Sequence, residues 1–255
     1  MTELLLLVAG LIGGALNSLA GGGSFVVFPA LLAAGVPPVL ANASNTFAAL
    51  PGYASGAAGF WADIMKHRER LLLYSLMSLV FGYLGAELLL HVSDAQFELA
   101  VPWLMLFAVV LFAFGARLNL WVQSKASDSR RLRATGAVLL LGLLAATCVY
   151  GGFFNAGLGI LLLAFLALAG LNDIHAMNGI KLWISFIIAL VAVARFALGD
   201  AIDWYHGTIA LVGVTIGGYV AARLAYFIPA RLIRALVIVY GVVLTGYFFW
   251  DAYAA

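Results

Sequence analysis

The chain has 255 residues, of which 65% are hydrophobic and only 9% are charged, and its formal net charge is +2. An average soluble domain carries about 25% charged residues. This composition, with a mean hydropathy of +1.10, excludes a soluble enzyme, a disordered chain and a nucleic-acid-binding domain. A single cysteine, Cys148, excludes a disulfide framework and a thiolate metal site. The composition predicts an all-α polytopic membrane protein whose solvent is the lipid bilayer.

Ten apolar stretches follow one another along the chain, and eight of them are long enough to cross a bilayer, which takes about 20 helical residues. The eight long stretches are 3–20, 40–60, 71–92, 99–118, 134–155, 174–199, 206–225 and 231–250. The other two, 24–34 and 158–169, have 11 and 12 residues, which corresponds to about half a membrane. The first stretch lacks the positive charge that opens a signal peptide, so we expect it to remain in the mature protein.

A glycine cluster precedes each short stretch: Gly21-Gly22-Gly23 in the first case and Gly157-Leu158-Gly159 in the second. Open backbone at membrane depth is tolerated only inside protein or beside a water-filled cavity, so we expect a helix break at each cluster. The short segments after the breaks either re-enter or cross the membrane. Ser24 is the expected N-cap of the first one. A helix start carries free N–H groups and partial positive charge, which favours anion binding, whereas tight helix packing is the alternative role of the glycines.

The loops differ in charge, and the difference predicts their sides. Basic residues gather at 66–70, 117–133 and 223–234, which the positive-inside rule assigns to the cytoplasm. The loops at 93–98 and 200–205 contain acids but no lysine or arginine, and should face outward. The first half of the chain therefore begins outside and the second half inside.

The two halves also match in sequence, at an offset of 135 to 138 residues. The matching segments are GGALN at 13–17 with GGFFN at 151–155, LLAAGV at 31–36 with LALAGL at 166–171, and ANASN at 41–45 with MNGIK at 177–181. Chance similarity between apolar segments is the alternative. The match predicts two inverted-topology repeats, an architecture typical of secondary transporters, with the site near the membrane midplane. We expect an N-terminal transmembrane repeat at 1–118, a basic cytoplasmic linker at 119–133 and a C-terminal transmembrane repeat at 134–255.

These motifs resemble those of the TauE/SafE family of sulfite and organosulfonate transporters, also called toluene sulfonate uptake permeases. The resemblance covers nearly the whole chain. It rests on the glycine-rich break with its asparagine, and on the asparagine-bearing segment that follows, in both halves. It implies a multi-pass protein of the cytoplasmic (inner) membrane that moves a small sulfur-containing anion. The inverted repeats lead us to expect that it works by alternating access. The direction of transport, the coupling ion (H⁺ or Na⁺) and assembly into a homo-oligomer stay open.

The candidate substrate-binding residues surround the two breaks and the segments after them. They are Asn17, Gly21, Gly22, Gly23, Ser24, Asn42, Asn45, Thr46, Asn155, Gly157, Gly159, Asn178 and Lys181. Asn17 and Asn155, just before the breaks, could each tie down the broken backbone or donate to an anion oxygen. Lys181 is the strongest candidate, because a lysine at the centre of a span costs about 2.5–3.5 kcal/mol and usually faces a cavity or a partner. Snorkelling to the cytoplasmic head groups is one alternative role, and a neutral, deprotonated lysine is the other.

Three further ionisable residues lie in the spans and are candidates for coupling or gating: Glu87, His91 and Arg195. Glu87 and His91 are four residues apart, which suits either proton coupling or a structural pair. Arg195 is expected mainly to anchor the helix at the interface, with a gate as the alternative.

The sequence contains no Walker A loop, no zinc-hydrolase motif and no nucleophile elbow. We therefore expect no enzyme activity, no cofactor and no metal ion. A passive anion channel, and a membrane-embedded enzyme or assembly factor, are the competing readings.

Overall fold

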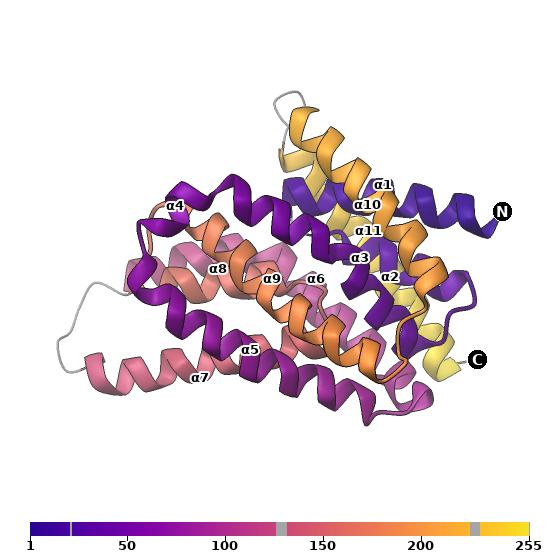
Figure 1. Ribbon diagram of the computed structural model, residues 1–255, viewed down its shortest axis with the longest axis horizontal. Coiled ribbons are helices and arrows are strands. Elements are labelled where there is room, and N and C mark those ends of the chain that lie inside the picture. Colours follow the sequence, from indigo (N-terminus) through magenta and orange to yellow (C-terminus); the bar gives the residue numbers. More distant parts are fainter. Residues whose placement is uncertain (21, 126–131, 225–229, 255) are drawn as a thin grey trace.

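A computed structural model describes residues 1–20, 22–125, 132–224 and 230–254, and all the regular structure in these residues is helical (Figure 1). The helices are α1 (Thr2–Ala20), α2 (Ser24–Ala33), α3 (Pro38–Gly59), α4 (Trp61–Met65), α5 (Arg68–Leu90), α6 (Asp94–Lys125), α7 (Leu132–Phe153), α8 (Leu158–Leu168), α9 (Ile174–Leu198), α10 (Trp204–Leu224) and α11 (Ala230–Ala254). The predicted all-α class is confirmed. Helix α4, a single short turn, has no counterpart among the predicted stretches.

The two short helices, α2 and α8, end in the same way. After α2, Gly35 adopts a φ of +84°, and Val36 N–H donates back to the carbonyl of Leu31 over 3.1 Å. After α8, Gly170 also has a φ of +84°, and Leu171 N–H donates to Leu166 over 3.0 Å. This left-handed glycine cap satisfies carbonyls that the helix end would otherwise leave without a donor. It stops both helices at half the length of a membrane span.

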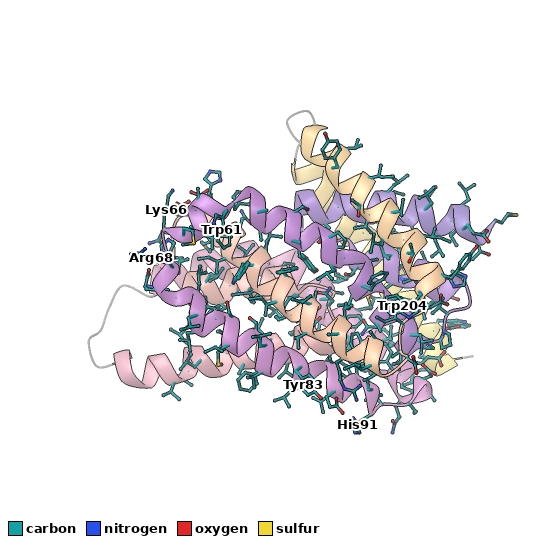
Figure 2. All side chains as sticks on the ribbon, viewed as in Figure 1. Trp61, Lys66, Arg68, Tyr83, His91 and Trp204 are labelled. Atoms are coloured by element: carbon teal, nitrogen blue, oxygen red, sulfur yellow. The ribbon has the colours of Figure 1, made fainter. Side chains whose placement is uncertain are left out.

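The helices run between two ends of the molecule that carry opposite charge. We call them the basic end, where Lys66, Arg68 and Arg70 lie, and the acidic end, where Glu3, Asp94 and Asp203 lie. Figure 2 shows Lys66 and Arg68 at the basic end, with Trp204 and His91 toward the acidic end. By the positive-inside rule, we expect the basic end to face the cytoplasm.

Hydrogen bonds fix which loops lie at which end. Arg70 Nη1 donates to the carbonyl of Ala169 over 2.9 Å, which ties the loop between α8 and α9 to the basic end. Val39 N–H donates to Asp94 Oδ1 over 2.9 Å, which ties the start of α3 to the acidic end. Tyr205 O–H donates to Glu3 Oε1 over 3.3 Å, so α1 begins at the acidic end as well.

The helix pairs α1–α2 and α7–α8 therefore form hairpins that open in opposite directions (Figure 1). The α1–α2 pair starts and finishes at the acidic end. The α7–α8 pair starts and finishes at the basic end. Each hairpin places its helix break inside the molecule.

Backbone contacts through glycine join each hairpin to a long helix. A Cβ on Gly14 of α1 would lie only 2.1 Å from the carbonyl oxygen of Val214 in α10. A Cβ on Gly152 of α7 would likewise lie 2.1 Å from the carbonyl oxygen of Gly82 in α5. Such close approach is possible only without side chains. Two such contacts occur in both halves of the chain. The contact Gly14–Val214 corresponds to Gly152–Gly82, and Gly217–Leu11 corresponds to Gly85–Val149.

The outer surface is apolar in the way that lipid contact requires. Along α5, Leu72, Leu76 and Leu88 are 71%, 51% and 53% exposed, a stripe that water would not favour. Among the described residues, α5 and α9 are long and apolar enough to cross a membrane, by length and composition alone. Parts or all of α1, α2, α7 and α8 qualify only as shorter apolar helices. The expected number of eight spans therefore stays a prediction.

Candidate functional site

The second helix break lies where it was expected. Helix α7 ends at Phe153, and α8 begins at Leu158 after Gly157, which adopts a φ of +78°. This left-handed backbone favours glycine. A Cβ at Gly157 would also lie 3.1 Å from the Cβ of Ala108 in α6, so the site is crowded as well as strained for any other residue.

Three hydrogen bonds hold the backbone of this break. Asn42 Nδ2 donates to the carbonyl of Phe153 over 2.8 Å, and Tyr150 O–H donates to the carbonyl of Ala156 over 2.7 Å. Tyr53 O–H donates to Asn155 Oδ1 over 3.1 Å. Sequence reasoning missed both tyrosines, because a tyrosine in an apolar stretch carries no signal that separates packing from such a bond.

Two polar atoms at this break are buried with no hydrogen-bond partner among the residues that the structure describes. They are Asn42 Oδ1 and Asn155 Nδ2, and the two side chains are only 1% and 3% exposed. A buried polar group left unpaired costs about 1–3 kcal/mol, so each one calls for an explanation. Asn42 Oδ1 is a hydrogen-bond acceptor, and Asn155 Nδ2 is a donor. The break therefore offers a donor, in addition to its helix start, to a bound solute or water.

Lys181 reaches this break from α9, where it is the eighth residue. Its Nζ donates to Asn178 Oδ1 over 3.1 Å. Its aliphatic stem packs on Gly159, the second residue of α8, since a Cβ on this glycine would lie 3.4 Å from Lys181 Cδ. Lys181 thus joins two other predicted residues, one on its own helix and one at the start of the short helix.

The charge around Lys181 is unbalanced. Among the described residues, no carboxylate lies within ion-pair distance of its ammonium group. The start of α8 adds about half a positive charge. The Gly159 N–H also finds no carbonyl acceptor in the described part of the chain. A cation beside a helix N-terminus is repelled by about 0.3–1 kcal/mol. An anion bound between them would instead be attracted by both the cation and the helix N-terminus.

The first break differs in detail from its expected form. Helix α1 ends at Ala20 and α2 begins at Ser24, while Gly21 lies outside the described residues. The predicted N-cap at Ser24 is wrong by one position. Gly23 is the N-cap, with helical φ and ψ of −60° and −37°, and its carbonyl already accepts from Val27 N–H over 3.2 Å. Gly22 contributes a further turn, because its carbonyl accepts from Phe25 N–H over 3.2 Å.

Four predicted residues meet at a small cavity beside this first break. Its volume is about 10 Å³, the space of about one water molecule. The predicted residues that line it are Asn17, Gly23, Ser24 and Asn45, and the others are Gly13, Val27, Ala49 and Val214. A sulfur oxyanion is several times larger than one water, so the cavity is closed to such a solute in this conformation.

Helix α3 touches both breaks. Asn42 bonds to the second break, while Asn45, one turn further on, lines the cavity at the first. The rings of Phe28 in α2 and Phe154 at the second break also meet edge to face at 5.7 Å. Thr46 has a local role instead, since its hydroxyl donates to the carbonyl of Asn42 over 3.1 Å within α3.

The three residues considered for coupling or gating form one cluster between α5 and α9, toward the acidic end. The Arg195 guanidinium makes two contacts with the Glu87 carboxylate, through Nε and through Nη2, the latter at 3.2 Å. His91 Nδ1 lies 3.6 Å from Glu87 Oε1. Sequence reasoning had placed Arg195 at the interface as an anchor. The structure shows that Arg195 also has an acidic partner, 108 residues away in the chain, and its anchoring role stays a prediction.

Comparison with known proteins finds similarity along nearly the whole chain. The family model described as sulfite exporter TauE/SafE matches residues 6–248. A probable membrane transporter protein of Haemophilus influenzae is 28% identical over 250 residues, which cover 97% of this chain and 94% of the relative. The probable membrane transporter protein ORF9 of a Sinorhizobium species is 29% identical over 240 residues, covering 94% and 89%. The probable membrane transporter protein YfcA of Escherichia coli K12 is 28% identical over 246 residues, covering 95% and 88%. No solved structure matches the chain.

Proposed function

Because the chain belongs to the sulfite exporter TauE/SafE family of membrane transporters, we propose that it is a secondary transporter of a small sulfur-containing anion of the sulfite or organosulfonate class. It works by alternating access in the cytoplasmic (inner) membrane. The anion binds between Lys181 and the start of α8, with Asn155 and Asn178 at its edges.

One observation carries this proposal. Lys181 packs on Gly159 at the positive end of α8, and no carboxylate balances it among the described residues. In a low-dielectric surrounding, two positive features at one place favour an anion strongly. A tetrahedral or pyramidal oxyanion has several acceptor oxygens, so it can use the ammonium group, the Gly159 N–H and Asn155 Nδ2 together.

The arrangement of the hairpins supports alternating access between inverted repeats. The α1–α2 and α7–α8 hairpins open to opposite ends, and the glycine contacts Gly14–Val214 and Gly152–Gly82 recur with the same geometry. In inverted-repeat transporters, one repeat rocks against the other around a fixed site. The cavity at the first break, about 10 Å³, is too small for an oxyanion, which is consistent with a conformation in which the first hairpin is closed.

The test is the flux of radiolabelled sulfite into proteoliposomes that contain the purified chain or its Lys181→Gln variant. A charge-assisted hydrogen bond contributes about 1.5–3 kcal/mol, so we expect flux at low substrate to fall about 10- to 100-fold in the variant. Lys66→Gln is the matched control, because Lys66 pairs with Asp63 at the basic end, outside the site, and its flux should equal that of the wild type.

Equal flux in the wild type and the Lys181→Gln variant would remove Lys181 from the mechanism. Absence of flux for sulfite and for organosulfonates would remove the substrate class. Acceleration of labelled uptake by unlabelled sulfite inside the vesicles is expected of a transporter. Its absence, together with single-channel currents, would instead identify a passive anion channel.

A further inference from the structure

A large apolar cavity lies away from both helix breaks, between α1, α2, α6 and α11. Its volume is about 990 Å³. Its floor is formed by small and branched side chains such as Ala9, Val26 and Ala30, and the proposed transport mechanism makes no use of it.

The cavity is elongated along the helices. On α1 its lining runs from Leu5 to Leu16, and on α11 from Tyr240 to Ala252. At 1.5 Å per residue, the two runs are about 16 Å and about 18 Å long. This is about half of a 30 Å hydrocarbon core, so the cavity has the depth of one leaflet. Leu5 and Asp251 lie at the acidic end, so the cavity opens to the leaflet on that side.

The mouth of the cavity is negative. Glu98 of α6 and Asp251 of α11 are its only charged lining residues within the described chain, and both are exposed. The described lining includes no lysine or arginine. Two unbalanced carboxylates above an apolar channel favour a cationic group attached to a hydrocarbon chain, and they repel an anionic head group.

The corresponding place in the second half of the chain is filled by protein. There α6 packs directly on α8 and on the break before it, with Ala108 against Gly157. In the first half, α2 meets α11 at Phe28 and Phe248, whose ring centres are 6.4 Å apart, and the cavity lies beside this contact. An empty apolar cavity loses packing energy. The hydrocarbon chains of the surrounding lipids are the groups best placed to fill it.

We propose that this cavity binds one acyl chain of a phospholipid from the leaflet at the acidic end, and that Glu98 and Asp251 select a head group with an ammonium, such as phosphatidylethanolamine. The inference is independent of which solute the protein transports. It predicts a lipid site with a preference set by two named carboxylates.

The test of the head group is native mass spectrometry of the full chain, titrated at low ionic strength with phosphatidylethanolamine or phosphatidylglycerol of identical acyl chains. A charge near a membrane surface is worth about a fivefold preference. The wild type should therefore bind phosphatidylethanolamine at least fivefold more tightly, and the Glu98→Gln, Asp251→Asn double variant should bind both lipids equally. Asp200→Asn, an exposed acid at the same end that does not line the cavity, should keep the wild-type preference. Equal binding of the two lipids by the wild type would overturn the selection by charge.

The test of the cavity is to fill it. Ala30→Leu with Ala33→Leu adds side-chain volume to the wall that α2 contributes. The double variant should lose the tightly bound lipid while its sulfite flux and its thermal midpoint without lipid stay unchanged. A filled variant that still retains one lipid as tightly as the wild type would overturn the site. A filled variant that changes only the oligomeric state would do the same, since the cavity would then be an interface between copies.

Discussion

Lys181 lies beside the positive end of a helix. Its stem lies on Gly159, its ammonium group bonds to Asn178, and the positive end of α8 begins beside it. The residue types at this place could be predicted from the sequence, because a lysine inside an apolar stretch and a glycine before a short helix are both local signals. Their contacts could not, since they depend on how α8 packs against α9.

The same limit applies to the residues that hold the break. Tyr53 and Asn155 are 102 residues apart, and Asn42 and Phe153 are 111 apart. No local pattern predicts such pairs. The sequence indicates only that each asparagine needs a partner in lipid.

At the residue scale, Gly157 should be less tolerant of alanine than Gly170. Both have positive φ, +78° and +84°, so alanine costs about 1–2 kcal/mol of backbone strain at either position. A Cβ at Gly157 also meets Ala108 at 3.1 Å, whereas a Cβ at Gly170 meets nothing within 4 Å. Thermal unfolding in detergent should show a larger loss of stability for Gly157→Ala than for Gly170→Ala. Equal losses would mean that crowding by α6 does not restrict the break.

Among the elements, the hairpins are the units that the sequence describes best. The break positions, the short lengths of α2 and α8 and the helical class follow from glycine clusters and apolar lengths. The sequence pattern alone did not reveal the contact between α5 and α9, where Glu87 and Arg195 form an ion pair. Each residue lies in an apolar stretch, and an ion pair between two helices becomes visible only when the helices are placed together.

This ion pair should stabilise the contact between α5 and α9. Glu87→Gln and Arg195→Gln should each lower the thermal midpoint by a few degrees, because each leaves a half-buried charge without its partner. The combined variant should be more stable than the sum of the two losses predicts. A double-mutant cycle of thermal midpoints measures this, with Glu98→Gln as a control acid that has no arginine partner in the described chain. Strict additivity would show that the pair contributes nothing to the helix contact.

For the whole molecule, the account depends on the two hairpins opening to opposite sides of the membrane. The match between the halves and the charges of the loops predicted this arrangement. The hydrogen bonds of Arg70 to Ala169 and of Val39 to Asp94 place the open ends of the two hairpins at opposite ends of the molecule, and the inverted repeat itself stays a prediction. What the sequence could not supply is how closely the two breaks approach one another, because that depends on α3 lying between them.

Cysteine accessibility in whole cells tests this arrangement. On a background of Cys148→Ala, which removes a buried thiol, Pro37→Cys should react with a membrane-impermeant thiol reagent added outside. Asn172→Cys should react only after the cells are opened. Ser93→Cys and Lys66→Cys serve as references for the outer and inner sides. Labelling of Pro37→Cys and Asn172→Cys from the same side would contradict opposed hairpins.

The central claim is that an oxyanion rests between Lys181 and the start of α8. The most direct measurement is anomalous diffraction, at the selenium edge, from crystals of the chain with unlabelled methionine soaked in selenite, a heavier analogue of sulfite. The account predicts a selenium peak within about 4 Å of both Lys181 Nζ and Gly159 N, the reach of a hydrogen bond through one oxygen, and its loss in Lys181→Gln. A peak elsewhere with this place empty, or a peak that survives the substitution unchanged, would contradict it.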